Sequence, residues 1–277
     1  MMTDNVERSR MSADNILETR QLSKEFKGFV AVDRVDLNVT RGSIHALIGP
    51  NGAGKTTCFN LLTKFHTPTA GSIHFNGRDI TREAPAQIAR RGIIRSFQIS
   101  AVFPHLSVLE NVRVALQRSL GSSFHFWRSE QSLASLNPRA IELLASVDLE
   151  SYAYTLTAEL SYGRKRALEI ATTLAMNPEL MLLDEPTQGM GLEDVDRIRQ
   201  LIKKVSANRT VLMVEHNMSV VASIADTITV LQRGATLAEG AYADVSKNPA
   251  VIEAYMGSAN TQFSGNSLMG SALRGPH

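Results

Sequence analysis

The chain is poor in cysteine: its 277 residues include a single one, Cys58. One thiol cannot form an internal disulfide framework, and such scarcity is typical of proteins from reducing compartments. Cys58 lies early in a helix expected after a glycine-rich loop. We expect it to pack against a sheet there rather than to act in redox chemistry. The fold must therefore depend on a hydrophobic core, and a chain of this length can bury a large one.

An excess of one charge and a long apolar run are also missing. The chain has 29 Lys and Arg against 27 Asp and Glu, so its net charge predicts no nucleic-acid partner. No apolar run approaches the roughly 18 residues of a membrane-spanning helix, and the polar, charged start has no apolar segment typical of a signal peptide. We therefore expect a soluble protein, which can still dock on a membrane partner.

The most informative segment that is present is residues 49–57, which read GPNGAGKTT and match the phosphate-binding pattern G-x-x-x-x-G-K-[ST]. An apolar, strand-like run precedes it and a helical stretch follows, as this motif requires. Glycines let backbone N–H groups turn towards phosphate oxygens, and the helix N-terminus adds its positive dipole end. Lys55 should reach the β- and γ-phosphates, and the Thr56 hydroxyl should bind Mg²⁺. The nucleotide-binding residues expected here are Gly49, Pro50, Asn51, Gly52, Ala53, Gly54, Lys55, Thr56 and Thr57.

Two carboxylates, Asp184 and Glu185, follow an apolar run at residues 180–183. An apolar run without alternation is typical of a central parallel strand, whose carboxyl end faces a ligand crevice. We expect Asp184 to orient the Mg²⁺ shell and Glu185 to polarise the attacking water as a general base. Two carboxylates this close repel each other without a cation between them, which favours this interpretation over a solvated turn.

His216 and Gln98 follow two further strand-like segments, at residues 211–214 and 93–97. The imidazole can bond the γ-phosphate and the attacking water. Alone, a histidine in that place would more often be structural, but the two preceding motifs favour a catalytic role. The Gln98 amide can meet both the Mg²⁺ shell and the water, so Gln98 is a candidate catalytic residue and metal ligand.

Ser161, Tyr162 and Gly163 open another expected helix, for which Ser161 is a natural N-cap. Taken alone, these residues leave two interpretations open. The segment is either a capped helix and nothing more, or a helix N-terminus that points out of the subunit at the phosphate of a nucleotide held by a partner.

The order of expected elements predicts one folded domain over residues 16–257, between a flexible arm at 1–15 and a disordered tail at 258–277. Strand signals stop between residue 107 and about 175, so a helical subdomain, at about 100–176, is expected inside an α/β domain. Strands are expected at 16–20, 35–39, 44–48, 72–75, 180–183, 211–214, 227–231 and 236–238, and the helices of the insert at 108–118, 138–147 and 163–176.

The order and spacing of these motifs resemble the nucleotide-binding subunits of ATP-binding cassette (ABC) transporters, over about residues 17–257. The resemblance implies an α/β fold: a P-loop ABC ATPase core with a parallel sheet, an antiparallel β subdomain and an inserted helical subdomain. It also implies that two cassettes sandwich two ATP molecules, each site combining one phosphate loop with Ser161, Tyr162 and Gly163 of the other subunit. Phe26 stands where an aromatic ring stacks on adenine in that family; otherwise it is a core residue at a strand end.

Residues 60–63, 102–112, 162–171 and 251–257 resemble the ATPases of branched-chain amino acid importers, a group that includes carriers of related amides. The resemblance implies ATP and Mg²⁺ as cofactors and a peripheral place on the cytoplasmic face of the bacterial inner membrane. It implies permease subunits and a second cassette as partners, either a sibling or a second copy, and a solute-binding protein as an indirect one. The lipopolysaccharide-export type of ATPase is the alternative. A soluble ABC ATPase of DNA repair or the ribosome is disfavoured by the single phosphate loop and the lack of sustained heptads.

Three departures from the family pattern bear on the site: Tyr162, Arg164 and Gly191. The usual signature LSGGQ reads LSYGR here, with Ser161 and Gly163 kept. Arg164 takes the place of glutamine, and we expect it to face solvent rather than nucleotide. Gly191 stands where the family usually has the aspartate of the loop that couples the two sites across the dimer, which puts the strength of that coupling in doubt.

Overall fold

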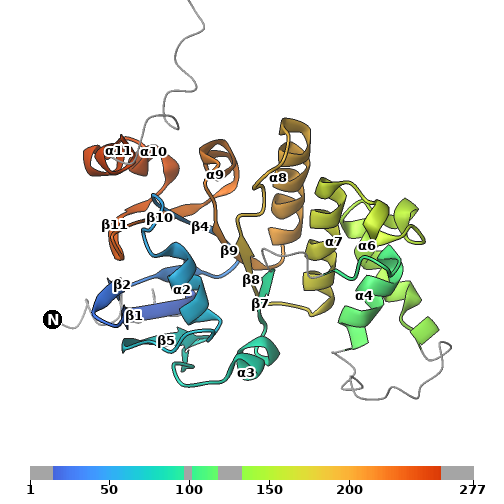
Figure 1. Ribbon diagram of the computed structural model, residues 1–277, viewed down its shortest axis with the longest axis horizontal. Coiled ribbons are helices and arrows are strands. Elements are labelled where there is room, and N and C mark those ends of the chain that lie inside the picture. Colours follow the sequence, from blue (N-terminus) through green and yellow to red (C-terminus); the bar gives the residue numbers. More distant parts are fainter. Residues whose placement is uncertain (1–14, 97–101, 118–132, 257–277) are drawn as a thin grey trace, which may run out of the picture.

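Figure 1 shows the computed structural model, which describes residues 15–96, 102–117 and 133–256. Gln98, residues 1–14 of the predicted arm and the predicted tail therefore lie outside the described residues, whereas Asn15, which was assigned to the arm, begins the first strand. None of the helices in the described ranges is long and apolar enough to cross a membrane.

A six-stranded sheet in the order β11-β10-β4-β9-β8-β7 forms the centre of the fold. Its neighbours pair in parallel except β10 and β11, which are antiparallel. Every residue of β4, β8 and β9 is buried, as expected for strands covered on both faces. The strands are β4 (Ile44–Ile48), β7 (Ile93–Ser96), β8 (Leu180–Asp184), β9 (Thr210–Val214), β10 (Thr227–Gln232) and β11 (Ala235–Gly240).

An antiparallel sheet in the order β2-β1-β5-β6, with β3 paired to β1, is built from the N-terminal part of the chain. Sequence reasoning predicted one strand at 35–39 and missed β2. In the structure β2 ends at Val35 and a separate strand, β3, begins at Asn38. β2 reads FVAVDRV, so its first four residues are all apolar although the first two are exposed, and no apolar–polar alternation marks it as a half-buried strand. The strands are β1 (Asn15–Phe26), β2 (Phe29–Val35), β3 (Asn38–Thr40), β5 (Ala70–Phe75) and β6 (Arg78–Asp79).

Helix α2 (Lys55–Leu62) lies between the two sheets (Figure 1). Its buried Phe59 and Leu62 belong to one core cluster with Leu17 and Phe75 of the antiparallel sheet and Leu212 of the parallel sheet. This shared core fixes the helix that follows the phosphate loop against both sheets.

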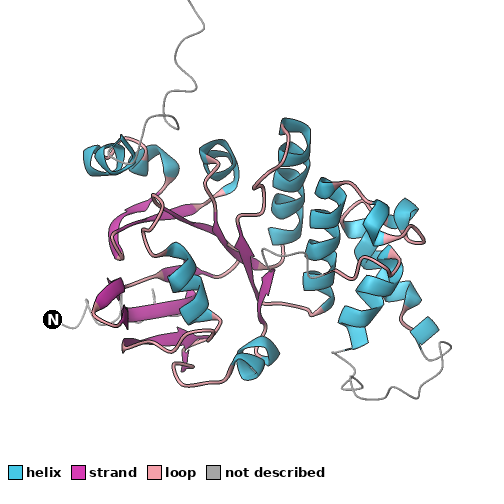
Figure 2. Ribbon diagram, in the orientation of Figure 1, coloured by secondary structure: helices cyan, strands magenta, loops and turns pink. Residues whose placement is uncertain are grey.

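The strand-poor stretch forms a group of helices at one end of the molecule (Figure 2). It contains α4 (Val108–Gln117), α6 (Asn137–Ser146) and α7 (Tyr162–Ala175), which contact one another, with the short turns η2 (Glu150–Tyr152) and η3 (Thr157–Glu159). Helix α7 also contacts β7 and α8, so it joins this group to the central sheet. The remaining helices are α3 (Pro85–Arg90), α8 (Leu192–Ser206), α9 (Met218–Ile224), α10 (Tyr242–Val245) and α11 (Pro249–Met256).

A buried polar chain crosses the central sheet at His45 of β4. His45 Nε2 lies 2.7 Å from Thr229 Oγ1, and the Thr229 hydroxyl donates to Glu239 Oε2 at 2.6 Å. Because that hydroxyl has one proton to donate, it accepts from His45, so Nε2 carries the imidazole proton. His45 Nδ1 is buried without a partner, and burial lowers the pKa of His45 to about 4.

This pKa predicts that the folded protein loses stability in acid. The unfolded chain takes up the His45 proton near pH 6.5 but the folded chain only near 4, so the contribution of neutral His45 is present above pH 6.5 and is lost as the pH falls towards 4. The loss should be about 3 kcal/mol. In denaturant titrations between pH 7 and pH 4, H45Q should therefore lose less stability than the wild type. Replacement of the exposed His105 by glutamine is the matched control; equal acid losses in H45Q and the wild type would contradict the assignment.

Candidate functional site

The phosphate-binding loop connects β4 to α2, and two of its glycines are required by close packing. Gly49 has φ 148°, and a Cβ there would lie 2.2 Å from the Leu231 carbonyl oxygen. Gly54 has φ 101°, and a Cβ there would lie 2.5 Å from the Ala31 carbonyl oxygen. The backbone at Leu231 and Ala31 therefore packs directly against these two glycines and fixes the turn of the loop at the N-terminus of α2.

Lys55 bends back over this loop. Its Nζ donates to the carbonyl oxygens of Gly49 at 2.6 Å and Pro50 at 3.0 Å. Burial lowers the pKa of Lys55, and the negative charges of Glu185 and Asp184 oppose that shift. A buried ammonium at the mouth of this loop is suited to bind an anionic group. The cavity at this point has a volume of about 300 Å³ and is lined by Phe29, Ala31, Asn51, Gly52, Ala53, Gly54, Lys55, Thr56, Thr57, Glu185 and His216.

Asp184, the last residue of β8, is fully buried. Its Oδ2 accepts a hydrogen bond from Arg95 Nη2, and Arg95 also donates to Asn60 Oδ1 at 2.7 Å. Asp184 Oδ1 has no partner, which is costly for a buried carboxylate. A hard cation or one of its water ligands would satisfy this oxygen, so the residue fits Mg²⁺. The described residues contain no group of three or more His, Cys, Asp or Glu able to hold a metal.

Glu185 and His216 form a hydrogen-bonded pair across neighbouring strand ends. Glu185 Oε1 lies 2.8 Å from His216 Nε2. Glu185 has φ 46°, in the left-handed region that a side chain disfavours, and its N–H donates to the Val214 carbonyl oxygen at 2.9 Å. Such strain is found at functional sites, where the surrounding structure must hold it. Because both side chains line the cavity of Lys55, the structure brings these three predicted residues together.

Glu215 holds the backbone of His216 through a hydrogen bond, a role that sequence reasoning missed. Its buried carboxylate accepts the Thr187 hydroxyl on one oxygen. The other oxygen accepts the backbone N–H groups of His216 at 2.7 Å and Asn217 at 3.2 Å. These bonds tie the loop after β8 to the loop after β9. A carboxylate directly after four buried apolar residues was the available signal, but its partner Thr187 is distant in sequence.

The signature residues lie at the N-terminus of α7, and none of them lines the Lys55 cavity of the same chain. Ser161 is the N-cap, and its side chain accepts from the Arg164 N–H at 3.4 Å. Ser161 and Tyr162 are exposed, whereas Gly163 is buried so closely that a Cβ would lie 2.4 Å from Asp194 Oδ1. Contrary to the expectation that it faces solvent, Arg164 is half-buried with its guanidinium 4.2 Å from the centre of the Tyr152 ring.

Two aromatic residues lie near the tip of the antiparallel sheet. Phe26 packs edge-on against His66, with the ring centres 5.1 Å apart, and Lys24 Nζ lies 4.9 Å from the Phe26 ring centre. Phe29, across the turn, lines the cavity of the phosphate loop and is 68% exposed. Sequence reasoning selected Phe26 and missed Phe29, because the turn that brings Phe29 to the cavity was not predicted.

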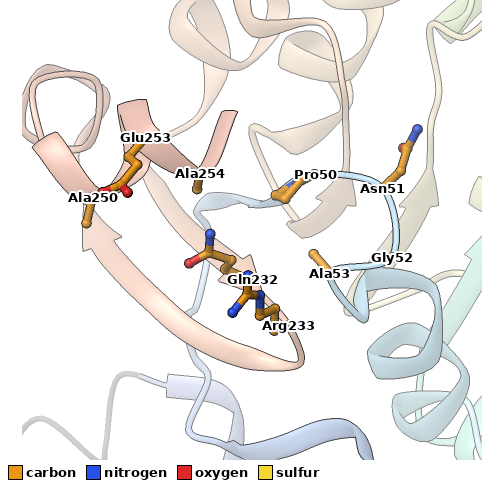
Figure 3. A pocket seen from close by; sticks show the side chains of 9 residues that line it. All are labelled: Pro50, Asn51, Gly52, Ala53, Gln232, Arg233, Ala250, Glu253 and Ala254. Carbon is orange, nitrogen blue, oxygen red and sulfur yellow. The ribbon is translucent and has the colours of Figure 1, made fainter. Parts of the chain in front are cut away.

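A second cavity, of about 500 Å³, lies on the other side of the phosphate loop against α11. Figure 3 shows the side chains of Gln232 and Arg233 between the loop and the helix that carries Glu253. Nearby, burial raises the pKa of Tyr255 to about 12, opposed by a hydrogen bond with the Gly49 backbone. Helix α11 therefore contacts the first residue of the phosphate loop.

Comparisons with known proteins agree with this geometry. The family model described as "ABC transporter" matches residues 32–188, and the model described as "Branched-chain amino acid ATP-binding cassette transporter" matches residues 235–260. The chain is 39% identical to the high-affinity branched-chain amino acid transport ATP-binding protein BraF of Pseudomonas aeruginosa, over 88% of this chain and 98% of BraF. It is 37% identical to LivG of Escherichia coli, a protein of the same description, over the same shares of the two chains.

Solved structures show the same fold. The ADP-bound form of MJ1267, an ATP-binding cassette of an ABC transporter, is 30% identical and superposes with a TM-score of 0.78, covering 88% of this chain and 99% of MJ1267. The dimeric bacterial ABC transporter cassette MJ0796 is 27% identical with a TM-score of 0.68, covering 81% of this chain and 98% of that one. The predicted fold class and family resemblance are confirmed, and the chain belongs to the ABC transporter family as an ATP-binding cassette.

Proposed function

We propose that this chain is the ATP-hydrolysing subunit of an importer of branched-chain amino acids or closely related amino acids and amides. The observation that carries the proposal is a single cavity that combines Lys55, the Glu185–His216 pair and the phosphate loop. The names of BraF and LivG support the transported class. The match of residues 235–260 to the branched-chain model favours import over the lipopolysaccharide-export alternative.

Each group at the cavity has a distinct part in hydrolysis. The backbone N–H groups of residues 51–57 and the Lys55 ammonium would hold the phosphates, since oriented amides and a buried cation stabilise anionic oxygens. Thr56 and Asp184, with Gln98, would hold Mg²⁺, which neutralises charge on the β- and γ-phosphates. Glu185 would orient the attacking water and accept its proton, while His216 fixes the Glu185 carboxylate. Phosphoryl transfer then depends mainly on positioning and electrostatics.

A second cassette would complete the site. Ser161 and Tyr162 are exposed at a helix N-terminus that lines no cavity of its own phosphate loop, as expected if Ser161, Tyr162 and Gly163 meet the nucleotide of an opposing subunit. The dimeric form of MJ0796 supports such pairing. The opposing subunit is a sibling cassette or a second copy, and we favour a sibling. Phe26 would stack on adenine. Permeases would bind the pair at the cytoplasmic face of the membrane, with a solute-binding protein as the indirect partner.

The first test removes the proposed general base. E185Q should still bind MgATP, because Lys55 and the phosphate loop are intact, but its turnover should fall by about 10²–10⁴-fold. The variant should accumulate as an ATP-bound closed pair of cassettes, measured by size-exclusion chromatography with light scattering and by phosphate release. Steady turnover near the wild-type rate in E185Q would contradict the role of Glu185.

The second test removes the phosphate-binding cation. K55A should bind MgATP about 10- to 150-fold more weakly, because a charged hydrogen-bond donor to phosphate is lost. Fluorescent-nucleotide titration measures this, with K203A on the exposed face of α8 as the control. An unchanged dissociation constant in K55A would rule out the proposed phosphate contact.

The third test addresses the transported class. The chain, assembled with permease subunits and a second cassette, should hydrolyse ATP faster when a leucine-, isoleucine- or valine-loaded binding protein is added to proteoliposomes. Uptake of radiolabelled leucine that depends on Glu185 would accompany this. Active ATP hydrolysis without stimulation by any of the three amino acids would exclude branched-chain amino acids as the transported class while leaving the ATPase proposal intact.

A further inference from the structure

One buried arginine of α7, Arg166, makes contacts that the proposed chemistry does not yet use. Arg166 is 7% exposed and lies one helical turn after Gly163 of the signature. Its Nη2 donates to the carbonyl oxygens of Asp184 at 2.8 Å and Glu185 at 3.1 Å, and its Nε donates to that of Pro186 at 3.3 Å. One side chain therefore binds three consecutive carbonyl groups of the turn that carries the proposed base.

That turn needs support from outside. Glu185 has φ 46°, a conformation that a residue with a side chain adopts only when its surroundings hold it. Its N–H is held by the Val214 carbonyl oxygen at 2.9 Å. Its own carbonyl is held by Arg166. The two bonds fix both sides of the strained residue and so direct its side chain towards His216, 2.8 Å away.

Glu169 orients Arg166 from the next turn of the same helix. Its Oε2 accepts from Arg166 Nη1, and the two side chains are 5% and 8% exposed. The carboxylate neutralises the guanidinium in a buried place where a lone charge would be costly. The planar guanidinium has five donors in a fixed fork, so it can bind the carboxylate and the three carbonyls together, which a lysine ammonium cannot.

We infer that Arg166 is a positioning residue that links the signature end of α7 to the catalytic turn of the same chain. The inference rests on the proposed function, in which Ser161 and Gly163 meet a nucleotide held by the opposing subunit. A short helical segment is rigid, so a displacement of the N-terminus of α7 moves the Arg166 fork with it. Occupation of one nucleotide site would thereby act on Glu185 of the other site, through α7 rather than through the loop that ends in Gly191.

The variant R166K tests the hydrogen-bonding geometry of the Arg166 guanidinium separately from its positive charge. R166K keeps a cation beside Glu169 but loses simultaneous contact with the three carbonyls. Turnover at saturating MgATP should fall about 10- to 100-fold, because small displacements of a catalytic group are costly. The dissociation constant for MgATP, which depends on the phosphate loop, should stay within twofold. ATP-driven association in an E185Q background should persist, because Ser161 and Gly163 are unchanged.

Two further variants keep the inference falsifiable. The double variant R166M/E169L removes both buried charges together, so that neither is left unpaired, and should match R166K in its loss of turnover. R139K is the matched control, since Arg139 pairs with Glu142 at the same helical spacing on α6 but is half exposed; it should retain wild-type turnover. All rates are measured by phosphate release from the assembled transporter.

Turnover within twofold of wild type in R166K or in the double variant would overturn the inference. So would an R166K loss of turnover accompanied by an equal loss of MgATP affinity, because that pattern indicates general damage to the fold. A wild-type transporter without any ATP hydrolysis would instead contradict the proposed function itself.

Discussion

The register of three parallel strands is the constraint on which the site depends. Asp184 of β8 is paired with Val214 of β9, and Val214 is paired with Leu47 of β4. The three strands therefore end at one level, and the residues that follow them form a single edge. The phosphate loop, the carboxylate turn and the histidine loop all start from that edge. A slip of one residue in either pairing would turn these groups towards opposite faces of the sheet.

Most of the buried carboxylates at and near this edge have a positively charged or hydrogen-bonding partner. Arg95 faces Asp184, Arg166 faces Glu169, and the Glu215 carboxylate receives one hydroxyl and two backbone N–H groups. Inside a protein such networks are strongly stabilising when complete and costly when incomplete. The one open place among these carboxylates is Asp184 Oδ1, and it lies where the proposed chemistry requires a metal. The arrangement is thus organised before ligand arrives, which is the condition for electrostatic catalysis.

Sequence reasoning recovered those parts of the site that are local in the chain. The phosphate loop, Asp184, Glu185 and His216 follow apolar runs directly, and the structure groups Lys55, Glu185 and His216 around one cavity. The expected helices of the insert agree with α4, α6 and α7 to within a residue. Contacts between distant segments were not predictable: Thr187 with Glu215, and Arg166 with the catalytic turn, join residues whose proximity is created by the fold. The half-exposed β2 was missed because its apolar residues do not alternate with polar ones, and Phe29 was missed with it.

The position of β4 has a consequence for how the protein is made. β4 is a central strand whose two neighbours, β9 and β10, begin at Thr210 and Thr227. On the ribosome, at about 5–20 residues per second, β4 waits roughly ten to thirty seconds for its first neighbour. Meanwhile α2 and the antiparallel sheet, whose segments are synthesised early, can cover only the face of β4 that carries Leu47, because Ile44, Ala46 and Ile48 belong to the other core cluster, with residues that are synthesised later. A truncated polypeptide that lacks β9 and β10 would expose this strand, so nascent chains stalled before Thr210 should depend on chaperones.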